Sequence, residues 1–385
     1  MSYSSAQIPI RHILVIRYKE IGDVLLSSVI CNTMRKSFPE AGIDYLMYDV
    51  TADLFRDHPS VDNVISITRE ERESNFKYLK KVRAIAKNDY DLIIDTTSTH
   101  RTELISLFAR KTPIRIGRLK PNRGFFYTHR FDLEKIRTMN PQGTTKVIER
   151  LAMLEPLAEM GYPLNGDRQM VLNVPDKVRN AMGAVMVRSG VNFNRPIFIF
   201  SVSAKYDHKR WRVDYMREVV KFCMDTYGAQ IILYAGSLKE REDIREFHAS
   251  MDSHKDIHSD IKTPTLINLA AIMTHCDMFV GNEGGPRHMS QALALPSAAV
   301  FSPSAIKSEW LPSNSRKYQG VECGDVIEVS AEDKNRMVLR ENFETDEYHE
   351  LYRQITPDSV IERIKDVISF VGLDRSIEFK NIQEQ

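Results

Sequence analysis

Short apolar runs rich in β-branched residues alternate with stretches of helical periodicity along most of this 385-residue chain. The first unit is the apolar run within His12–Arg17, followed by apolar residues at helical spacing from Leu26 to Met34. Fully apolar strands are typical of parallel sheets that are buried on both faces. Their alternation with helices predicts helices on both sides of such a sheet. We therefore expect an α/β protein built from doubly wound, Rossmann-like domains.

The alternation occurs in two series, and the length suits two cores better than one. A polar stretch at Arg188–Arg195 separates the series, which predicts a first domain at residues 1–180 and a second domain at about 190–350. A terminal helix is expected from Pro357 to Val371, because Thr356 and Pro357 are typical of a helix start. Further strands are predicted at Asp44–Tyr48, Val64–Ile67, Leu92–Asp95, Ile114–Gly117, Met170–Val174 and Ile197–Ser201.

The bulk composition excludes several classes of protein. Lys and Arg number 53 against 52 Asp and Glu, so a formal net charge of +1 gives no field that favours nucleic acid. Four scattered cysteines without a CxxC pair suggest neither a zinc site nor a disulfide scaffold. Neither a signal peptide nor an apolar run of about 18 residues is visible. We expect a cytoplasmic protein, and peripheral contact with the inner membrane stays open.

The segment Cys276–Ser304 holds the densest set of ligand-site features. It is predicted to form a strand, a turn with three glycines at Gly281–Gly285, a helix over Pro286–Leu295 and a further strand. Glycines let a ligand approach the backbone closely. Free N–H groups and the positive dipole end at the helix start favour an anion. A phosphate or diphosphate is the expected ligand.

Glu283 and His288 are polar residues of this unit, and each could have either a ligand-binding or a structural role. A carboxylate would repel a diphosphate, so a functional Glu283 is expected to accept hydrogen bonds from hydroxyls. Otherwise Glu283 is an acid that stabilises the helix start, and His288 is a packing residue. Both interpretations stay open on residue types alone.

Two other loops carry candidate residues. Ser201–Trp211 follows the first strand of the second series, where Lys209 could offset the charge that builds on a departing diphosphate. The alternative is a solvated charge run. Asp23 follows Gly22 at the start of the first helix, where an Asp often serves as a helix cap. A carboxylate there could also deprotonate an attacking hydroxyl.

Two further patterns are less specific. Asp89–Asp91 matches the DxD pattern of metal-dependent sugar transferases, but it precedes a strand and so belongs at the wrong end of the sheet. A loop from Arg115 to Arg130 is basic and aromatic, which suits a phosphorylated or carboxylated acceptor. A plain solvated loop is the alternative.

The order of these motifs resembles the family 9 glycosyltransferases, the ADP-heptose:lipopolysaccharide heptosyltransferases. The resemblance spans Ile13 to about Gly372 and is carried mainly by Gly22-Asp23, Lys209–Trp211 and Glu283–His288. The sequence departs from the family at two points. Glu283 stands where the family has Asp, and Ser302 stands where it has Gly before a proline turn.

The resemblance implies a GT-B architecture, in which two Rossmann-like domains face a central cleft and the terminal helix packs back on the first domain. It implies inverting transfer from ADP-heptose to a lipopolysaccharide core or other lipid-linked sugar acceptor, without a metal or another cofactor. Asp23 would be the general base. Lys209, Ser203, Gly284, Gly285 and His288 would hold the donor's diphosphate, and Glu283 its hydroxyls.

Two alternatives remain beside this interpretation. One keeps the fold and chemistry but uses another nucleotide sugar, such as a UDP-hexose or a UDP-N-acetylhexosamine. The other is a nucleotide-sugar-binding protein without activity.

Overall fold

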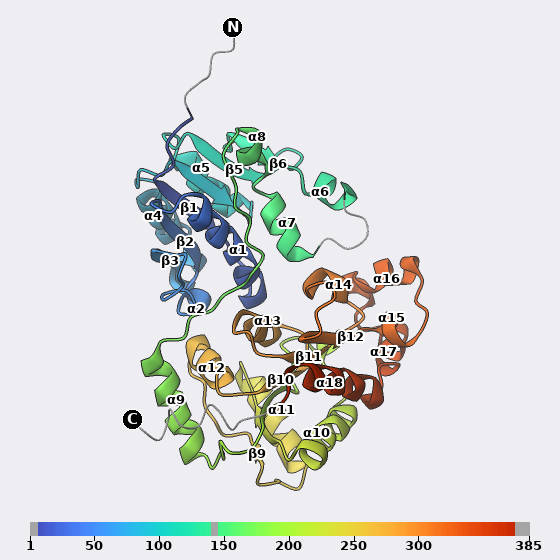
Figure 1. The fold of residues 1–385 in the computed structure, drawn as a ribbon. Coiled ribbons are helices and arrows are strands. Elements are labelled where there is room, and N and C mark those ends of the chain that lie inside the picture. Colours follow the sequence, from blue (N-terminus) through green and yellow to red (C-terminus); the bar gives the residue numbers. More distant parts are fainter. Residues whose placement is uncertain (1–6, 140–144, 374–385) are drawn as a thin grey trace. The chain divides into compact units, whose positions relative to one another are not determined.

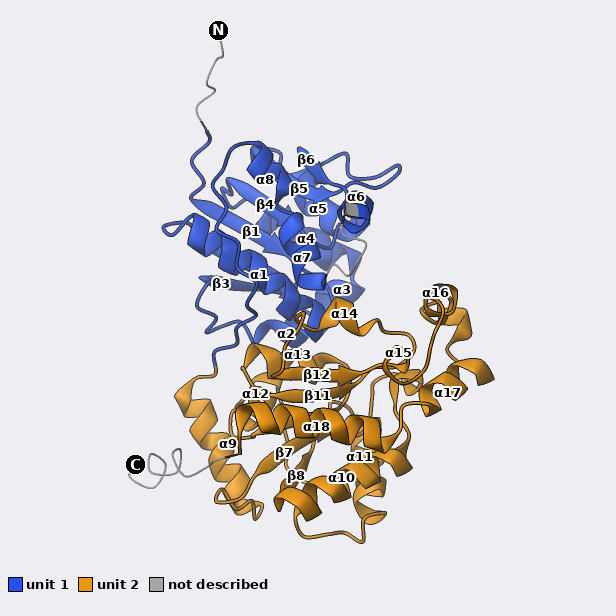
Figure 2. Cartoon of the chain, turned by 45° about the vertical axis from the view of Figure 1, so that its right-hand side comes forward, with its two compact units in different colours: residues 1–173 blue, residues 174–385 orange. Residues whose placement is uncertain are grey.

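The computed structural model describes residues 7–139 and 145–373. The chain divides into two compact units, Met1–Asn173 and Val174–Gln385, which are coloured separately in Figure 2. Each unit contains one six-stranded sheet in which every pairing is parallel.

The sheet of unit 1 has the order β3-β2-β1-β4-β5-β6 (Figure 1). Its strands are β1 (His12–Ile16), β2 (Gly42–Tyr48), β3 (Asn63–Ile67), β4 (Leu92–Asp95), β5 (Ile114–Arg118) and β6 (His129–Phe131). Its helices are α1 (Ile21–Ser37), α2 (Asp49–Ala52), α3 (Arg69–Glu73), α4 (Asn75–Ile85), α5 (His100–Phe108), α6 (Leu133–Met139), α7 (Lys146–Ala152) and α8 (Glu155–Glu159).

The sheet of unit 2 has the order β12-β11-β10-β7-β8-β9. Its strands are β7 (Ile197–Ser201), β8 (Gln230–Leu233), β9 (Ile257–His258), β10 (Met278–Asn282), β11 (Ser297–Val300) and β12 (Tyr318–Val321). Its helical segments are α9 (Asp176–Arg188), η1 (Asp207–Lys209), α10 (Val213–Tyr227), α11 (Leu238–Ala249), α12 (Leu266–Met273), α13 (Gly285–Ala292), α14 (Lys307–Trp310), α15 (Cys323–Val326), α16 (Ala331–Met337), η2 (Arg340–Asn342), α17 (Asp346–Arg353) and α18 (Pro357–Val371).

Both sheets follow the 3-2-1-4-5-6 order of a doubly wound fold, so the predicted fold class is confirmed. The strand order reverses between β1 and β4 in unit 1, and between β7 and β10 in unit 2. Ligands of such sheets bind beyond the carboxyl ends of the strands at these reversals. The loops that follow β1, β4, β7 and β10 are therefore the places to look for a site.

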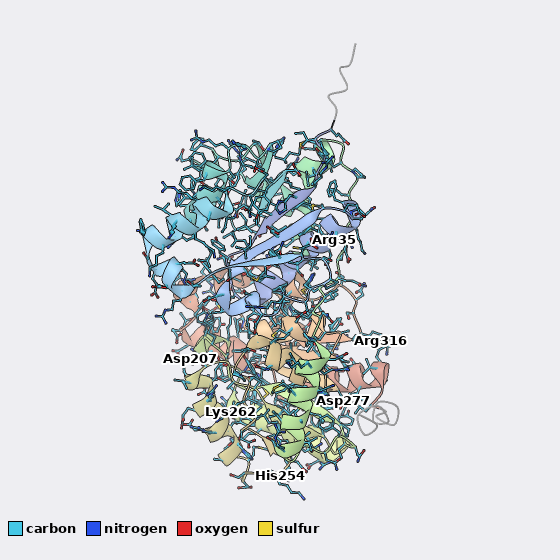
Figure 3. All side chains as sticks on the ribbon, turned by 90° about the vertical axis from the view of Figure 1, so that its left-hand side faces the viewer. Arg35, Asp207, His254, Lys262, Asp277 and Arg316 are labelled. Carbon is cyan, nitrogen blue, oxygen red and sulfur yellow. The ribbon has the colours of Figure 1, made fainter. Side chains whose placement is uncertain are left out.

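An Asp in front of the fourth strand of each sheet ties the first strand in place. In unit 1, Asp91 Oδ2 accepts hydrogen bonds from the backbone N–H groups of Arg11 and His12, at 2.8 and 3.0 Å. In unit 2, Asp277 Oδ2 accepts one from the N–H of Ile197 at 2.7 Å (Figure 3). These carboxylates satisfy backbone donors at the amino ends of the sheets, opposite to the ligand edge.

Each unit has its own apolar core. In unit 1, Leu14 and Ile16 of β1 pack with residues such as Val82 of α4 and Ile105 of α5. The core of unit 2 is larger because it includes residues of α10, α17 and α18 as well as the strands. The fully apolar strands are thus buried as their sequences predicted.

The last helix differs from the expectation. We predicted that the terminal helix packs back on the first domain, but α18 packs on β11, β12 and α10 of unit 2. The apolar stripe of Val360, Ile364 and Val367 is fully buried in the core of that unit. The stripe correctly predicted that one face of the helix is packed. An amphipathic pattern does not, however, indicate which elements that face packs against.

The boundary between the units also lies earlier than expected. The predicted linker followed α9, whereas the compact units separate before it, at residues 173 and 174. The helix belongs to unit 2 because it packs on α12, and His275 Nε2 lies 2.9 Å from the carbonyl oxygen of Arg179. The strand predicted at Met170–Val174 is not formed, and this segment runs without a sheet partner. Among the described residues, no helix combines the length and the apolar character needed to cross a bilayer.

Candidate active site

The turn between β10 and α13 lies directly against the end of β7. Gly281 has φ +129°, and a Cβ there would lie 2.4 Å from the carbonyl oxygen of Ser201. Only glycine fits this combination of dihedral angle and contact. The position brings the loop after β7 and the turn after β10 together at the reversal of the unit 2 sheet.

Asn282 then fastens the two loops to each other. Its Oδ1 accepts the backbone N–H of Trp211 at 2.9 Å, and its Nδ2 donates to the carbonyl oxygens of Ser201 and Ser203 at 3.1 and 3.3 Å. The side chain is almost completely buried. One amide therefore satisfies three backbone groups at the junction of the two loops. Sequence analysis assigned no role to this residue.

Lys209 and Glu283 meet within this framework. Lys209 Nζ lies 2.5 Å from Glu283 Oε1, and the Glu283 side chain is nearly buried whereas that of Lys209 is partly exposed. Two tyrosines of α17 hold the lysine loop: Tyr348 donates to the carbonyl oxygen of His208 and Tyr352 to that of Lys209, both at 3.0 Å. The two residues predicted for the diphosphate and for the donor hydroxyls thus form one ion pair.

Arg287 is a second cation beside this pair and was not singled out from the sequence. Its guanidinium is 1% exposed, and it donates to Gln291 Oε1 at 2.8 Å and to the His288 ring. Neither partner carries a negative charge, and burial lowers the pKa of Arg287 to about 10. Lys209 and Arg287 together carry one positive charge more than Glu283 neutralises. Such an excess at a helix start suits an anionic ligand.

His288 is neutral in this environment. Burial lowers its pKa far below the usual range, and the charges of Arg287 and Lys209 lower it further. The ring is 4% exposed and lies edge-on to Trp310, with centroids 5.4 Å apart. His288 can therefore contribute only as an uncharged hydrogen-bonding or packing group at neutral pH.

The hydroxyl of Ser203 is already engaged. It donates to Asp243 Oδ2 at 2.5 Å, and Arg210 Nη1 lies 3.0 Å from Asp243 Oδ1. Arg210, which we had considered as a substitute for Lys209, is thus paired with a carboxylate on α11. Asp207 faces Lys239 at 2.6 Å on the surface of unit 2 (Figure 3). Of these cations, Lys209 contacts Glu283 directly, and Arg287 interacts with it electrostatically.

Asp23 occupies the first turn of α1 at the carboxyl end of β1, as predicted. It accepts hydrogen bonds from Arg17 and, at 3.2 Å, from Arg150 Nη2 of α7. Burial alone would raise the pKa of Asp23, but the charges of Arg17 and Arg150 outweigh it and hold the pKa below its usual value. Its side chain remains a quarter exposed. Asp23 is therefore an ionised carboxylate that water can still reach.

The DxD sequence lies away from the ligand edge of the unit 1 sheet. Asp91 of the DxD sequence caps β1 at the amino end of the sheet, which confirms that it lies on the wrong side. Within residues 7–139 and 145–373, no three His, Cys, Asp or Glu side chains are grouped so that they could hold a metal ion. All four cysteines are buried free thiols.

Comparison with known proteins decides the family. The model of glycosyltransferase family 9 (heptosyltransferase) matches residues 78–337, which is more than half of the chain. This chain belongs to glycosyltransferase family 9. Among curated relatives, lipopolysaccharide heptosyltransferase 3 of Escherichia coli K12 is 24% identical over 288 residues, covering 73% of this chain and 79% of the relative.

Solved structures of family 9 proteins share the fold. A family 9 glycosyl transferase from Veillonella parvula superposes with a TM-score of 0.78 at 18% identity, covering 95% of this chain and 100% of that one. The ADP-heptose lipopolysaccharide heptosyltransferase II of E. coli gives a TM-score of 0.68 at 20% identity, covering 93% and 99%. The chain is a glycosyltransferase with the GT-B fold, as the motifs had indicated.

The surroundings of Asp23 contain residues that sequence reasoning missed. Arg17 ends an apolar strand and Arg150 lies on α7, and both are buried. A charged residue at the end of a fully apolar run was a usable signal for Arg17. Nothing in the sequence linked Arg150 to Asp23, because they are 127 positions apart.

Proposed function

We propose that this family 9 enzyme transfers a heptose from ADP-heptose to a sugar of the lipopolysaccharide core, with inversion at the anomeric carbon. The names of the curated relatives support the sugar and the acceptor. The observation that carries the proposal is the Lys209–Glu283 pair beside the start of α13, at the reversal of the unit 2 sheet. In this arrangement a cation for the diphosphate lies next to a hydrogen-bond acceptor for the hydroxyls of the sugar.

On the donor side, the start of α13 and Lys209 bind the diphosphate. Gly284 leaves open space, because a Cβ there would meet nothing within 4 Å, so phosphate oxygens can approach the backbone N–H groups of the turn. Lys209 stabilises the charge that develops on the leaving ADP. Glu283 accepts hydrogen bonds from the hydroxyls of the sugar. Neutral His288 and cationic Arg287 lie beside it on the buried side of the turn.

On the acceptor side, Asp23 is the general base. The attacking hydroxyl loses its proton to the carboxylate while its oxygen bonds to the anomeric carbon and the bond to the diphosphate breaks. Arg17 and Arg150 keep Asp23 ionised and limit its motion. A base of low pKa requires that most of the O–H bond breaking accompanies attack rather than precedes it.

A panel of donors tests the substrate. Turnover of ADP-heptose, UDP-glucose and UDP-N-acetylglucosamine should be compared with a lipopolysaccharide core acceptor, and ADP-heptose is expected to be used best. If only a UDP-sugar is turned over, the enzyme is a glycosyltransferase as proposed, but ADP-heptose is not its donor. Binding of ADP-heptose without turnover would instead support a non-catalytic binding protein.

A substitution of the base tests the mechanism. Asp23→Asn should lower kcat by about 10²-fold or more and leave the affinity for the donor unchanged. We choose Asn rather than Ala because its side-chain oxygen can still accept hydrogen bonds from the two buried arginines. Unchanged turnover would mean that Asp23 is not the base.

A further inference from the structure

A cationic and aromatic loop projects from the sheet edge of unit 1 and has no role in the proposed transfer. It joins β5 to β6, which are neighbours at the edge of the sheet (Figure 1), and comprises residues 119–128. From Leu104 to Phe131 the chain contains seven Lys and Arg residues and neither Asp nor Glu, although the whole chain carries a net charge of only +1. The cationic residues are Arg110, Lys111, Arg115, Arg118, Lys120, Arg123 and Arg130.

Bonds to the sheet hold the base of this loop. Tyr127 is buried and donates to the carboxylate of Asp95 at 2.6 Å. Arg115 Nε donates to the carbonyl oxygen of Phe126 at 2.9 Å, and Lys120 Nζ donates to the carbonyl oxygen of Ser98. The loop is therefore fastened on both sides of its tip, and the conformation of the tip is built into the fold.

Two apolar side chains of this fastened loop remain in solvent. Phe125 is 71% exposed and Leu119 is 46% exposed, although the adjacent Phe126 is half-buried and Tyr127 is buried. An exposed aromatic ring that is held outward in this way buries little apolar surface against the described part of the molecule. Insertion into an apolar environment outside the protein would bury the ring, which is favourable.

The charges around the ring are incompletely neutralised. Arg118 pairs with Glu134 at 3.0 Å, whereas Arg123 and Arg130 form no ion pair with any described residue. Burial lowers the pKa of Lys120, and the charges of Arg123 and Arg118 lower it further, which shows that the cations repel one another. An external anionic surface would relieve this repulsion.

We propose that the β5–β6 loop docks unit 1 on an anionic lipid bilayer, with Phe125 and Leu119 inserted among the headgroups and Arg118, Arg123 and Arg130 against lipid phosphates. A soluble phosphorylated ligand explains the cations but leaves the two apolar side chains in water. A bilayer interface satisfies both, because stable peripheral attachment takes an apolar and an electrostatic contribution together. This inference does not depend on the sugar that the enzyme transfers.

Co-sedimentation of the full chain with vesicles tests the docking. We expect binding to vesicles of equal parts phosphatidylglycerol and phosphatidylcholine, little binding to phosphatidylcholine alone, and weaker binding at high salt. Phe125→Ser should lower the partition coefficient by about tenfold or more. Arg123→Gln with Arg130→Gln should lower it by about 25-fold, since each cation contributes about fivefold.

Matched variants on α4 and in the turn after it control for general changes of surface. Phe76 is 77% exposed, so Phe76→Ser removes a comparable ring, and Lys80→Gln with Lys87→Gln removes two exposed cations. The proposal predicts that these controls bind as the unaltered chain does. Equal losses in both sets would overturn it. So would loop variants that bind vesicles normally but lose turnover of a phosphorylated acceptor, because the loop would then bind the acceptor.

Discussion

Lys209 Nζ and Glu283 Oε1 lie 2.5 Å apart in the donor site of unit 2. The two residues have different tasks in the proposed reaction, since one binds the diphosphate and the other the sugar hydroxyls. The lysine cannot serve both partners fully at the same time. When the donor binds, Lys209 must therefore exchange its contact with Glu283 for one with phosphate. Loss of the Glu283 carboxylate should then strengthen binding of the diphosphate part of the donor and weaken binding of the sugar part.

Glu283→Gln tests this exchange by calorimetry with ADP and with ADP-heptose. ADP should bind about fivefold tighter, because Lys209 no longer has a carboxylate to leave. ADP-heptose should bind about 2- to 30-fold more weakly, because the lost hydrogen bonds to a charged acceptor, about 1.5–3 kcal/mol, outweigh the fivefold gain in the ADP part. Glu309→Gln, on α14, is the control and should change neither affinity. If both ligands bind more weakly in Glu283→Gln, Lys209 and Glu283 do not compete.

Arg287→Met separates ligand binding from stability. The guanidinium is buried beside neutral partners, so its charge carries a desolvation cost that no carboxylate bonded to it offsets. We expect an unchanged or higher Tm together with weaker binding of ADP, because the site loses its excess positive charge. Arg287→Lys should restore part of the affinity.

Arg195→Met is the matched control for that variant. The Arg195 guanidinium forms two hydrogen bonds with Asp256, at 2.9 and 3.0 Å, so its removal leaves a carboxylate without its partner. This variant should lower the Tm and leave ADP binding unchanged. A large fall of the Tm in Arg287→Met would show that the buried cation stabilises the fold.

The pH dependence of turnover reports on the cations around Asp23. Their charges hold the pKa of Asp23 below its usual value of about 3.9, so the carboxylate stays ionised through the neutral range and is lost as a base only in acid. Arg150→Met removes one cation, so the pKa should rise and the acid limb of kcat/KM should move to higher pH. The same sign applies to folding: the contribution of the ionised Asp23 is present above about pH 3.9 and is lost as the pH falls through its lower folded pKa.

Lys146→Met provides the control on the same helix. Lys146 contacts Glu149 at 3.3 Å and is not among the cations that lower the pKa of Asp23. Its removal should leave the acid limb in place. An acid limb that is the same in the unaltered enzyme, Arg150→Met and Lys146→Met would contradict the assignment of that limb to Asp23.

Local patterns predicted the centre of each sheet and the edge at which Asp23, Lys209 and Glu283 lie. The apolar runs of β1, β4, β7 and β10 are buried on both faces, so their composition alone indicates a parallel sheet. The short edge strands β6, β9 and β12 were missed, because two to four residues carry too little periodicity. The packing surface of α18 was predicted wrongly because it depends on contacts distant in sequence.

The supporting residues of the site were missed for the same reason. Asn282 binds backbone groups that lie 71 to 81 positions away, and Arg150 reaches Asp23 across 127 positions. Spacing along the chain contains no trace of these contacts. The residues that a motif names are thus those next to the turn, whereas the residues that set their charge and position come from the assembled fold.

Gly281→Ala tests how strongly the junction of the two donor loops depends on glycine. A Cβ at this position would lie 2.4 Å from the Ser201 carbonyl oxygen and would need φ near +129°, so both a clash and backbone strain oppose it. Strain alone costs about 1–3 kcal/mol, and the clash adds to it because the contact is with backbone.

Gly228→Ala is the control, since Gly228 has φ +62° and open space around it. Urea unfolding should show a loss of about 1 kcal/mol for Gly228→Ala and at least about 3 kcal/mol for Gly281→Ala, with weaker ADP binding only in the second. Equal losses would mean that the loops after β7 and β10 can separate without consequence, and the donor site would then not depend on their contact.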